Sequence, residues 1–153
     1  MLTIGKAAPA FTLETDTGET LSLKDLKGTP VVLYFYPKDD TSGCTVEACE
    51  FRDVFPKFKK SKAVIVGVSP DPVKSHEKFK AKYHLPFTLL ADPDHAVAER
   101  YGVWKEKSMY GRKYMGIERT TFIINAAGKV ARVFPKVKPK GHAEEVHAAL
   151  AEL

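Results

Sequence analysis

The chain has 153 residues, which fits a single domain over residues 1–153 and is long enough to bury a core. With 44% hydrophobic and 28% charged residues it has the composition of a soluble globular protein, and no apolar run is long enough to cross a membrane. The first residues lack the charged-then-apolar pattern of a signal peptide, so we expect a cytoplasmic protein.

The formal net charge of +5 comes partly from two lysine-rich segments, residues 57–62 and 129–140. A positive charge of this size is compatible with nucleic-acid binding. These segments, however, fall at a helix end and in a connector that contains proline, and no recognisable nucleic-acid-binding motif accompanies them. We therefore interpret them as solvated surface and expect no nucleic-acid partner.

The N-terminal part predicts a hairpin that leads into a buried strand and a helix. Residues 11–13 and 20–23 read as strands around the turn 15–18, and residues 31–36 form an unbroken apolar and aromatic run typical of a strand buried on both faces. Turn and helix-starting residues follow at 37–43. Beyond them, apolar residues recur at helical spacing, at Val46, Cys49, Phe51, Val54, Phe55 and Phe58.

The remaining elements alternate in type. We expect a strand at 63–69, a helix at 73–83, a short strand at 87–90, a helix at 94–101, a hairpin of 120–125 and 129–134, and a final helix at 142–150. This order indicates an α/β fold in which helices flank a mixed central sheet.

Cys44 falls in the first turn of the predicted helix after the buried strand. Unpaired backbone N–H groups and the positive end of the helix dipole stabilise an anion there, so the thiol is a candidate nucleophile. The alternative is an inert, buried cysteine.

Cys49 lies five residues further along the same predicted helix. In an intact helix this separation puts the two Cα atoms about 8 to 9 Å apart, beyond the roughly 7 Å that a disulfide allows, so the pair bonds only if the helix opens. The alternative for Cys49 is an ordinary core position. The cysteine spacing does not match a zinc site, and none of the histidines suggests a metal set, so we expect no metal and no cofactor; these are His76, His84, His95, His142 and His147.

Several motifs together resemble the peroxiredoxins, in particular the bacterioferritin comigratory protein (PrxQ) subgroup. The pattern P-x3-T-x2-C is present at 37–44 with a second cysteine five residues on, and further matches are G-x-x-A-P-x-F at 5–11, F-T-L-L-A-D at 87–92, Y-G-V-W at 101–104 and R-T-T-F-I-I at 119–124. The chain departs from many relatives at Ser42, where they carry proline.

The resemblance implies a thioredoxin-like fold with an N-terminal extension and a peroxidase that reduces hydrogen peroxide and organic hydroperoxides. Cys44 would be the peroxidatic residue, and Cys49 the resolving residue that forms a disulfide with it. The other implied site residues are Thr41 and Arg119, which contact the sulfur and the peroxide, Gly43, whose N–H binds peroxide oxygens, and Pro37, an apolar wall. Thioredoxin or glutaredoxin would restore the dithiol of a monomeric enzyme.

Other interpretations remain open for the chain and for single residues. The same fold suits a protein thiol-disulfide oxidoreductase, although that class has C-x2-C at the helix start, and the cysteine pair also suits a non-enzymatic redox sensor. The alternative for Arg119 is a surface salt bridge. Glu47 is interpreted as a first-turn carboxylate or as a partner for Arg52, and Tyr101 and Trp104 as core residues or a hydrophobic wall near the site.

Overall fold

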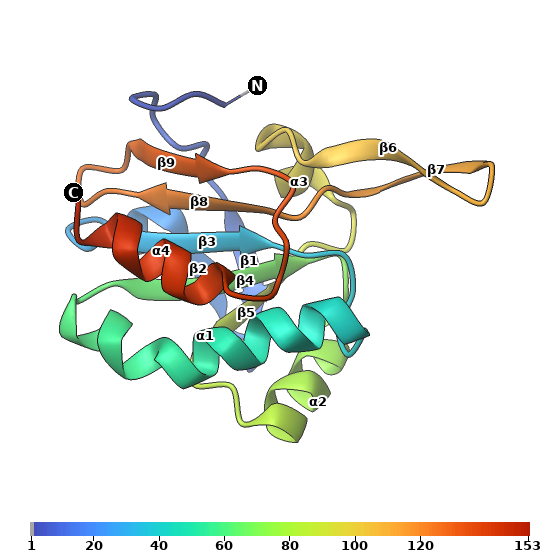
Figure 1. The fold of residues 1–153 in the computed structure, drawn as a ribbon, viewed down its shortest axis with the longest axis horizontal. Coiled ribbons are helices and arrows are strands. Elements are labelled where there is room, and N and C mark those ends of the chain that lie inside the picture. Colours follow the sequence, from blue (N-terminus) through green and yellow to red (C-terminus); the bar gives the residue numbers. More distant parts are fainter. Residues whose placement is uncertain (1) are drawn as a thin grey trace.

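A seven-stranded mixed sheet runs through the computed structural model, which describes residues 2–153 (Figure 1). The spatial order is β2-β1-β5-β4-β3-β8-β9. The strands are β1 (Thr12–Thr15), β2 (Thr20–Ser22), β3 (Val31–Phe35), β4 (Val64–Ser69), β5 (Thr88–Ala91), β8 (Thr120–Ile124) and β9 (Val130–Phe134).

The centre of the sheet is parallel and its edges are antiparallel. β3, β4 and β5 run in the same direction, while β8 pairs antiparallel with β3. All five residues of β3 are buried, which explains why this strand is a continuous apolar run rather than an alternating one.

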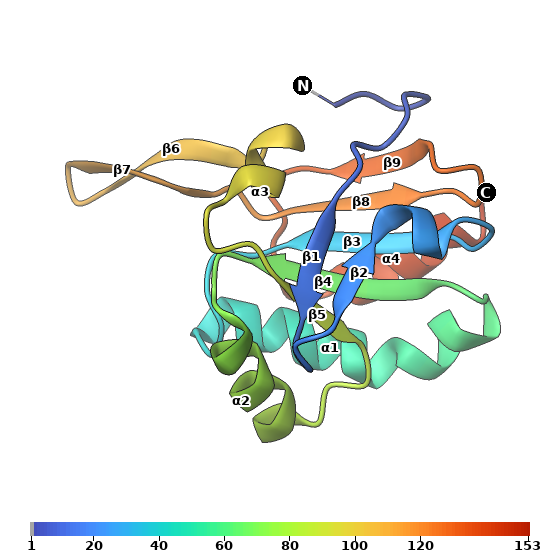
Figure 2. The same ribbon diagram turned by 180° about the vertical axis from the view of Figure 1, so that it is seen from behind.

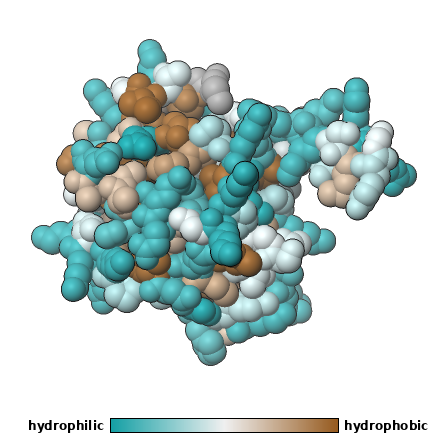
Figure 3. All heavy atoms as spheres, viewed as in Figure 1, coloured by the Kyte–Doolittle hydropathy of each residue, from teal (hydrophilic) through white to brown (hydrophobic). Residues whose placement is uncertain are grey.

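Three helices cover one face of the sheet: α1 (Ser42–Lys60), α2 (Val73–Tyr83) and α4 (His142–Leu150) (Figure 1). On this side Tyr34 of β3 and Tyr36, just after the strand, pack with Phe51 of α1. Hydrophilic side chains cover much of the outer surface of these helices (Figure 3).

The other face is covered by α3 (Ala96–Arg100), the short 3₁₀ helix η1 (Leu23–Leu26) and the N-terminal strands (Figure 2). There Leu33 and Phe35 of β3 pack in one cluster with Tyr101. β3 is thus buried between two apolar layers. Within residues 2–153, no helix combines the length and the apolar composition that a membrane crossing requires.

The structure confirms the predicted mixed sheet flanked by helices and the N-terminal hairpin, and it corrects two details. Leu23, expected to end the second strand, instead begins η1, and the helix expected at 94–101 is shorter, at Ala96–Arg100. His95, in the left-handed conformation, immediately precedes this shorter helix.

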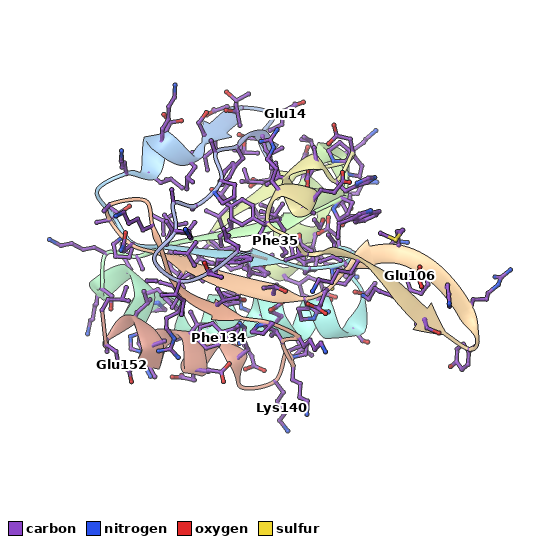
Figure 4. All side chains as sticks on the ribbon, turned by 90° about the horizontal axis from the view of Figure 1, so that it is seen from above. Glu14, Phe35, Glu106, Phe134, Lys140 and Glu152 are labelled. Atoms are coloured by element: carbon purple, nitrogen blue, oxygen red, sulfur yellow. The ribbon has the colours of Figure 1, made fainter. Side chains whose placement is uncertain are left out.

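The main element that the sequence analysis missed is a two-stranded arm, β6 (Trp104–Met109) and β7 (Arg112–Ile117), which projects from the body. Figure 4 shows Glu106 on this arm and Phe35 at the centre of the molecule. Most arm residues are exposed or half-buried, so there is little apolar periodicity to detect. At the tip of the arm, Tyr110 and Gly111 both have the positive φ of a type I′ hairpin turn, and the glycine at 111 is the sequence feature that indicates such a turn.

Gly67 of β4 lies directly under the ring of Tyr34. A Cβ atom at Gly67 would lie 2.9 Å from the Tyr34 hydroxyl oxygen and 3.0 Å from Leu89 Cδ2. We expect Gly67→Ala to lower the free energy of unfolding by about 1–3 kcal/mol because it overpacks a close-packed core, and urea denaturation measures this.

Tyr34→Phe provides the matched control for this clash. The buried Tyr34 hydroxyl has no hydrogen-bond partner among residues 2–153, so its removal leaves no polar group unsatisfied. Tyr34→Phe alone should change stability little, and combined with Gly67→Ala it should recover part of the loss. Wild-type stability of Gly67→Ala would contradict this account of the packing.

Candidate active site

A short loop connects the buried end of β3 to the first turn of α1. It starts from Tyr36, reverses at Asp40, whose φ is 59°, and enters the helix through Thr41 in extended conformation. Cys44 is the third residue of α1, in its first turn. The strand and the helix therefore hold both ends of the segment that presents the sulfur.

The first turn of α1 keeps its backbone donors available. Thr41 is the N-cap, but its hydroxyl donates to the carbonyl oxygen of Lys38 at 2.9 Å instead of capping the helix. The first amides of a helix have no carbonyl one turn earlier, so the amides of Gly43 and Cys44 remain donors at the positive end of the dipole. This arrangement suits an anion at or near the sulfur.

Arg119 lies against Cys44, although 75 positions separate them in the sequence. Its Nη2 atom is 3.2 Å from the Cys44 Sγ atom, and the Cys44 side chain is only 1% exposed. A Cβ atom at Gly43 would come within 3.2 Å of the same Nη2, so the absence of a side chain at Gly43 helps the guanidinium to approach the helix. A permanent positive charge therefore adjoins a buried sulfur.

Glu47 holds the other side of this guanidinium. Its Oε1 atom lies 2.6 Å from Arg119 Nη1, and the side chain is 1% exposed. Of the two alternatives for Glu47, the pairing with Arg52 is wrong, because Arg52 instead contacts Asp53 and the carbonyl oxygen of Tyr83. The planar fork of Arg119 is thus oriented by a carboxylate on one side and faces the sulfur on the other.

Burial changes the ionisation of this pair. It raises the pKa of Glu47 to about 7, against the opposing effect of the Arg119 charge. Burial acts to lower the pKa of Arg119, but the electrostatic and hydrogen-bonding interactions with Glu47 and Cys44 outweigh it and the net shift is upward. The second oxygen of Glu47, Oε2, is buried and has no hydrogen-bond partner within residues 2–153.

Lys107 is a cation near the site that sequence reasoning missed. It comes from β6, and its Nζ donates to the carbonyl oxygen of Ile117 at 2.6 Å. Burial lowers its pKa, as does the positive charge of Arg119 to a smaller extent, while Cys44 acts in the opposite sense. The Lys107 ammonium is therefore close enough to Arg119 and Cys44 for these two groups to influence its pKa.

The remaining candidate residues lie either in the loop before Cys44 or away from the thiol. Pro37 is half-buried and Thr41 is exposed, both in the loop before Cys44. Tyr101 packs in the apolar cluster on the opposite face of the sheet from Cys44, and Trp104 stacks on His95 with ring centroids 3.9 Å apart. Tyr101 is therefore a core residue rather than a wall of the site.

Cys49 is partly exposed on the same unbroken helix, and both thiols are free. Partial burial raises the pKa of Cys49, which favours its protonated form. Because α1 is continuous from Ser42 to Lys60, a bond between the two sulfurs requires its first turns to unwind.

The raised pKa of Glu47 makes stability depend on pH. Between pH 4.5 and about 7 the folded state retains a proton that the unfolded state releases, so this contribution is fully present below pH 4.5 and is lost as pH rises to about 7. At about 1.4 kcal/mol per pKa unit, the change is on the order of 3 kcal/mol.

Glu47→Gln keeps the shape of the side chain and removes the titrating group. We expect the stability difference between wild type and this variant to change over that pH range, as measured by urea denaturation at intervals from pH 4.5 to 8. A difference that is constant with pH would contradict the assignment.

Comparisons with known proteins identify the family of the chain. Residues 4–133 match the model of the AhpC/TSA family. The chain is 59% identical over 143 residues to a putative peroxiredoxin bcp of Coxiella burnetii, covering 94% of this chain and 95% of that one, and 51% identical over 150 residues to peroxiredoxin Bcp of Bacillus subtilis, covering 98% and 96%.

A solved structure of the bacterioferritin comigratory protein of Xanthomonas campestris, studied for alkyl peroxide reduction, superposes with a TM-score of 0.92 at 42% identity over 98% of each chain. A PrxQ mutant of Xylella fastidiosa gives 0.94 at 37% identity, over 99% of this chain and 97% of that one. These matches confirm the thioredoxin-like fold and the subgroup. The chain therefore belongs to the AhpC/TSA family and is a peroxiredoxin of the Bcp/PrxQ subgroup, a peroxidase.

Proposed function

We propose that Cys44 is the peroxidatic cysteine and that its thiolate attacks the terminal oxygen of a hydroperoxide. The sulfur gains that oxygen and becomes a sulfenic acid, the O–O bond breaks, and the departing oxygen takes a proton to leave as water or an alcohol. The contact of 3.2 Å between Arg119 Nη2 and Cys44 Sγ, at a helix N-terminus, is the observation that carries this proposal.

Several groups around the sulfur have roles in that step. Arg119 stabilises the thiolate and the charge that grows on the departing oxygen, and the amide of Gly43 is a further preorganised donor. The Thr41 hydroxyl has its proton committed to Lys38, so its oxygen accepts a hydrogen bond from the peroxide. Pro37 limits water around the sulfenic acid.

Cys49 is proposed as the resolving cysteine. Its thiol condenses with the Cys44 sulfenic acid to form a disulfide and release water, after the first turns of α1 unwind. A dithiol then reduces the disulfide by thiol-disulfide exchange and is itself oxidised.

The partners follow from this cycle. Organic hydroperoxides are substrates besides hydrogen peroxide, by analogy with the Xanthomonas relative. We assign thioredoxin as the reductant, with glutaredoxin as the alternative, and cytoplasm as the compartment. Both reacting cysteines belong to one helix of one chain, which supports a monomeric enzyme.

Replacement of each cysteine separates the two chemical steps. Cys44→Ser should abolish peroxide consumption, whereas Cys49→Ser should complete one turnover and then stall in the sulfenic form. Mass spectrometry of the wild type after one equivalent of peroxide should show a loss of about 2 Da in a peptide joining both sulfurs. Equal activity of wild type and Cys44→Ser would refute the proposal.

Arg119→Lys keeps the positive charge and removes the fork that contacts Cys44 and Glu47 together. We expect the rate constant for reaction with peroxide to fall about 10²-fold, the usual loss when a preorganised donor is removed. Stopped-flow competition against a reference peroxidase measures it. Arg132→Lys, which alters an exposed ion pair with Glu152, is the matched control, and an equal loss in both variants would contradict the role.

A further inference from the structure

A second polar cluster lies buried beneath the loop that carries Pro37 and Thr41. Its centre is Asp39, which is 7% exposed, and His76 of α2, which is fully buried. His76 Nδ1 lies 2.7 Å from Asp39 Oδ2. Neither residue takes part in the reaction proposed above, although Asp39 is flanked on both sides by residues of the peroxide-binding motif.

Both ring nitrogens of His76 face oxygen atoms that accept hydrogen bonds. Nδ1 points at the Asp39 carboxylate, and Nε2 lies 2.8 Å from the carbonyl oxygen of Leu90. A backbone carbonyl cannot donate, so Nε2 carries a proton. Asp39 also accepts hydrogen bonds from the hydroxyls of Tyr36, at 2.5 Å to Oδ1, and Ser75, at 2.8 Å to Oδ2, so both of its carboxylate oxygens are bonded inside the protein.

Hydrogen bonds hold the same loop through the backbone amide of Asp39 and through the exposed side chain of Asp40. The amide of Asp39 donates to Asp71 Oδ2 at 2.8 Å, and Asp71 in turn accepts from Ser69 at the end of β4. The next residue, Asp40, accepts from Lys82 and Tyr83 of α2. Thus the loop before Cys44 is held by side chains from α2 and from the end of β4.

The cluster also has the composition of a metal site, because ligand atoms of Asp39, Asp71 and His76 all lie within 4.8 Å of one another. Direct hydrogen bonds already occupy these atoms: Asp39 and His76 bond each other, and Asp71 accepts from Ser69 and from the Asp39 amide. The geometry is therefore that of a hydrogen-bonded network.

We propose that His76 is a positioning residue: its buried hydrogen bond with Asp39 holds the 37–41 loop in the conformation that attacks peroxide. This inference rests on the proposed roles of Cys44 and Cys49. The His76–Asp39 pair favours attack on peroxide, because attack needs the helix wound and the loop ordered. The same pair opposes the unwinding of α1 that disulfide formation requires. Loss of the pair therefore affects the two steps differently.

The test measures the two steps separately. In the Cys49→Ser background, competition kinetics give the rate constant of Cys44 with hydrogen peroxide. With both cysteines present, and at peroxide concentrations where attack is not limiting, rapid quenching with a thiol-alkylating reagent followed by mass spectrometry gives the rate of disulfide formation.

We expect His76→Gln to slow attack about 10-fold or more, since small misplacements of reacting groups have large effects on rate, and to leave disulfide formation unchanged or faster. Adding Asp39→Asn should restore part of the attack rate, because the double variant leaves no unpaired buried carboxylate. His142→Gln is the matched control: His142 is also buried, at 2% exposed, but it bonds Thr121 and Glu145 outside this network. It should lower thermal stability without changing the ratio of the two rates.

Unchanged attack in His76→Gln overturns the inference, as does a fall of both rates by the same factor, which marks a structural role alone. If His76→Gln does not fold, Ser75→Ala removes another hydrogen bond to the same Asp39 oxygen and should slow attack in the same selective way; no selective effect there also overturns it. A wild type that does not consume peroxide overturns the proposed function and this inference with it. A reactive wild type beside an equally reactive His76→Gln overturns the inference alone.

Discussion

The guanidinium of Arg119, shared between the Cys44 sulfur and the Glu47 carboxylate, is the interaction on which the site depends. Its position follows from strand register: Phe35 of β3 pairs with Thr120 of β8, so Arg119 lies level with the point where β3 becomes the active-site loop. A shift of one residue in that pairing would turn the Arg119 side chain to the opposite face of the sheet. The pairing of β3 with β8 thus brings the Arg119 guanidinium, from a distant part of the chain, to the N-terminus of α1.

Placing charge in a buried site has a physical consequence. Glu47 and Cys44 are almost fully removed from water and Arg119 is largely so, and Glu47 keeps one oxygen without a hydrogen-bond partner in the described chain. Burial of this kind opposes the charged form of the carboxylate and lets its neighbours influence it strongly. The stability of the folded protein and the charge state of the site are therefore linked through Glu47.

The proposed cycle makes two opposite demands on α1. Attack on peroxide requires the first turn to be wound, because only then do its amides and Arg119 converge on the sulfur. Disulfide formation requires the same turn to open, because the two cysteines of an intact helix are too far apart to bond. The loop before the helix is tied to α2 by Asp39 and Asp40, which gives the protein a means to balance these two conformations.

The sequence by itself determined the order of the main elements, the place of Cys44 in the first turn of a helix, and the need for that helix to open before Cys49 reaches it, because these depend on local patterns and fixed helical dimensions. It did not reveal the β6–β7 arm, whose mostly exposed residues lack an apolar period, or the place of Lys107 within β6. Only the tertiary structure decided that Glu47 pairs with Arg119 rather than Arg52, and that His76 meets Asp39. Such contacts join residues on different elements, and sheet register and helix packing, not spacing along the chain, bring them together.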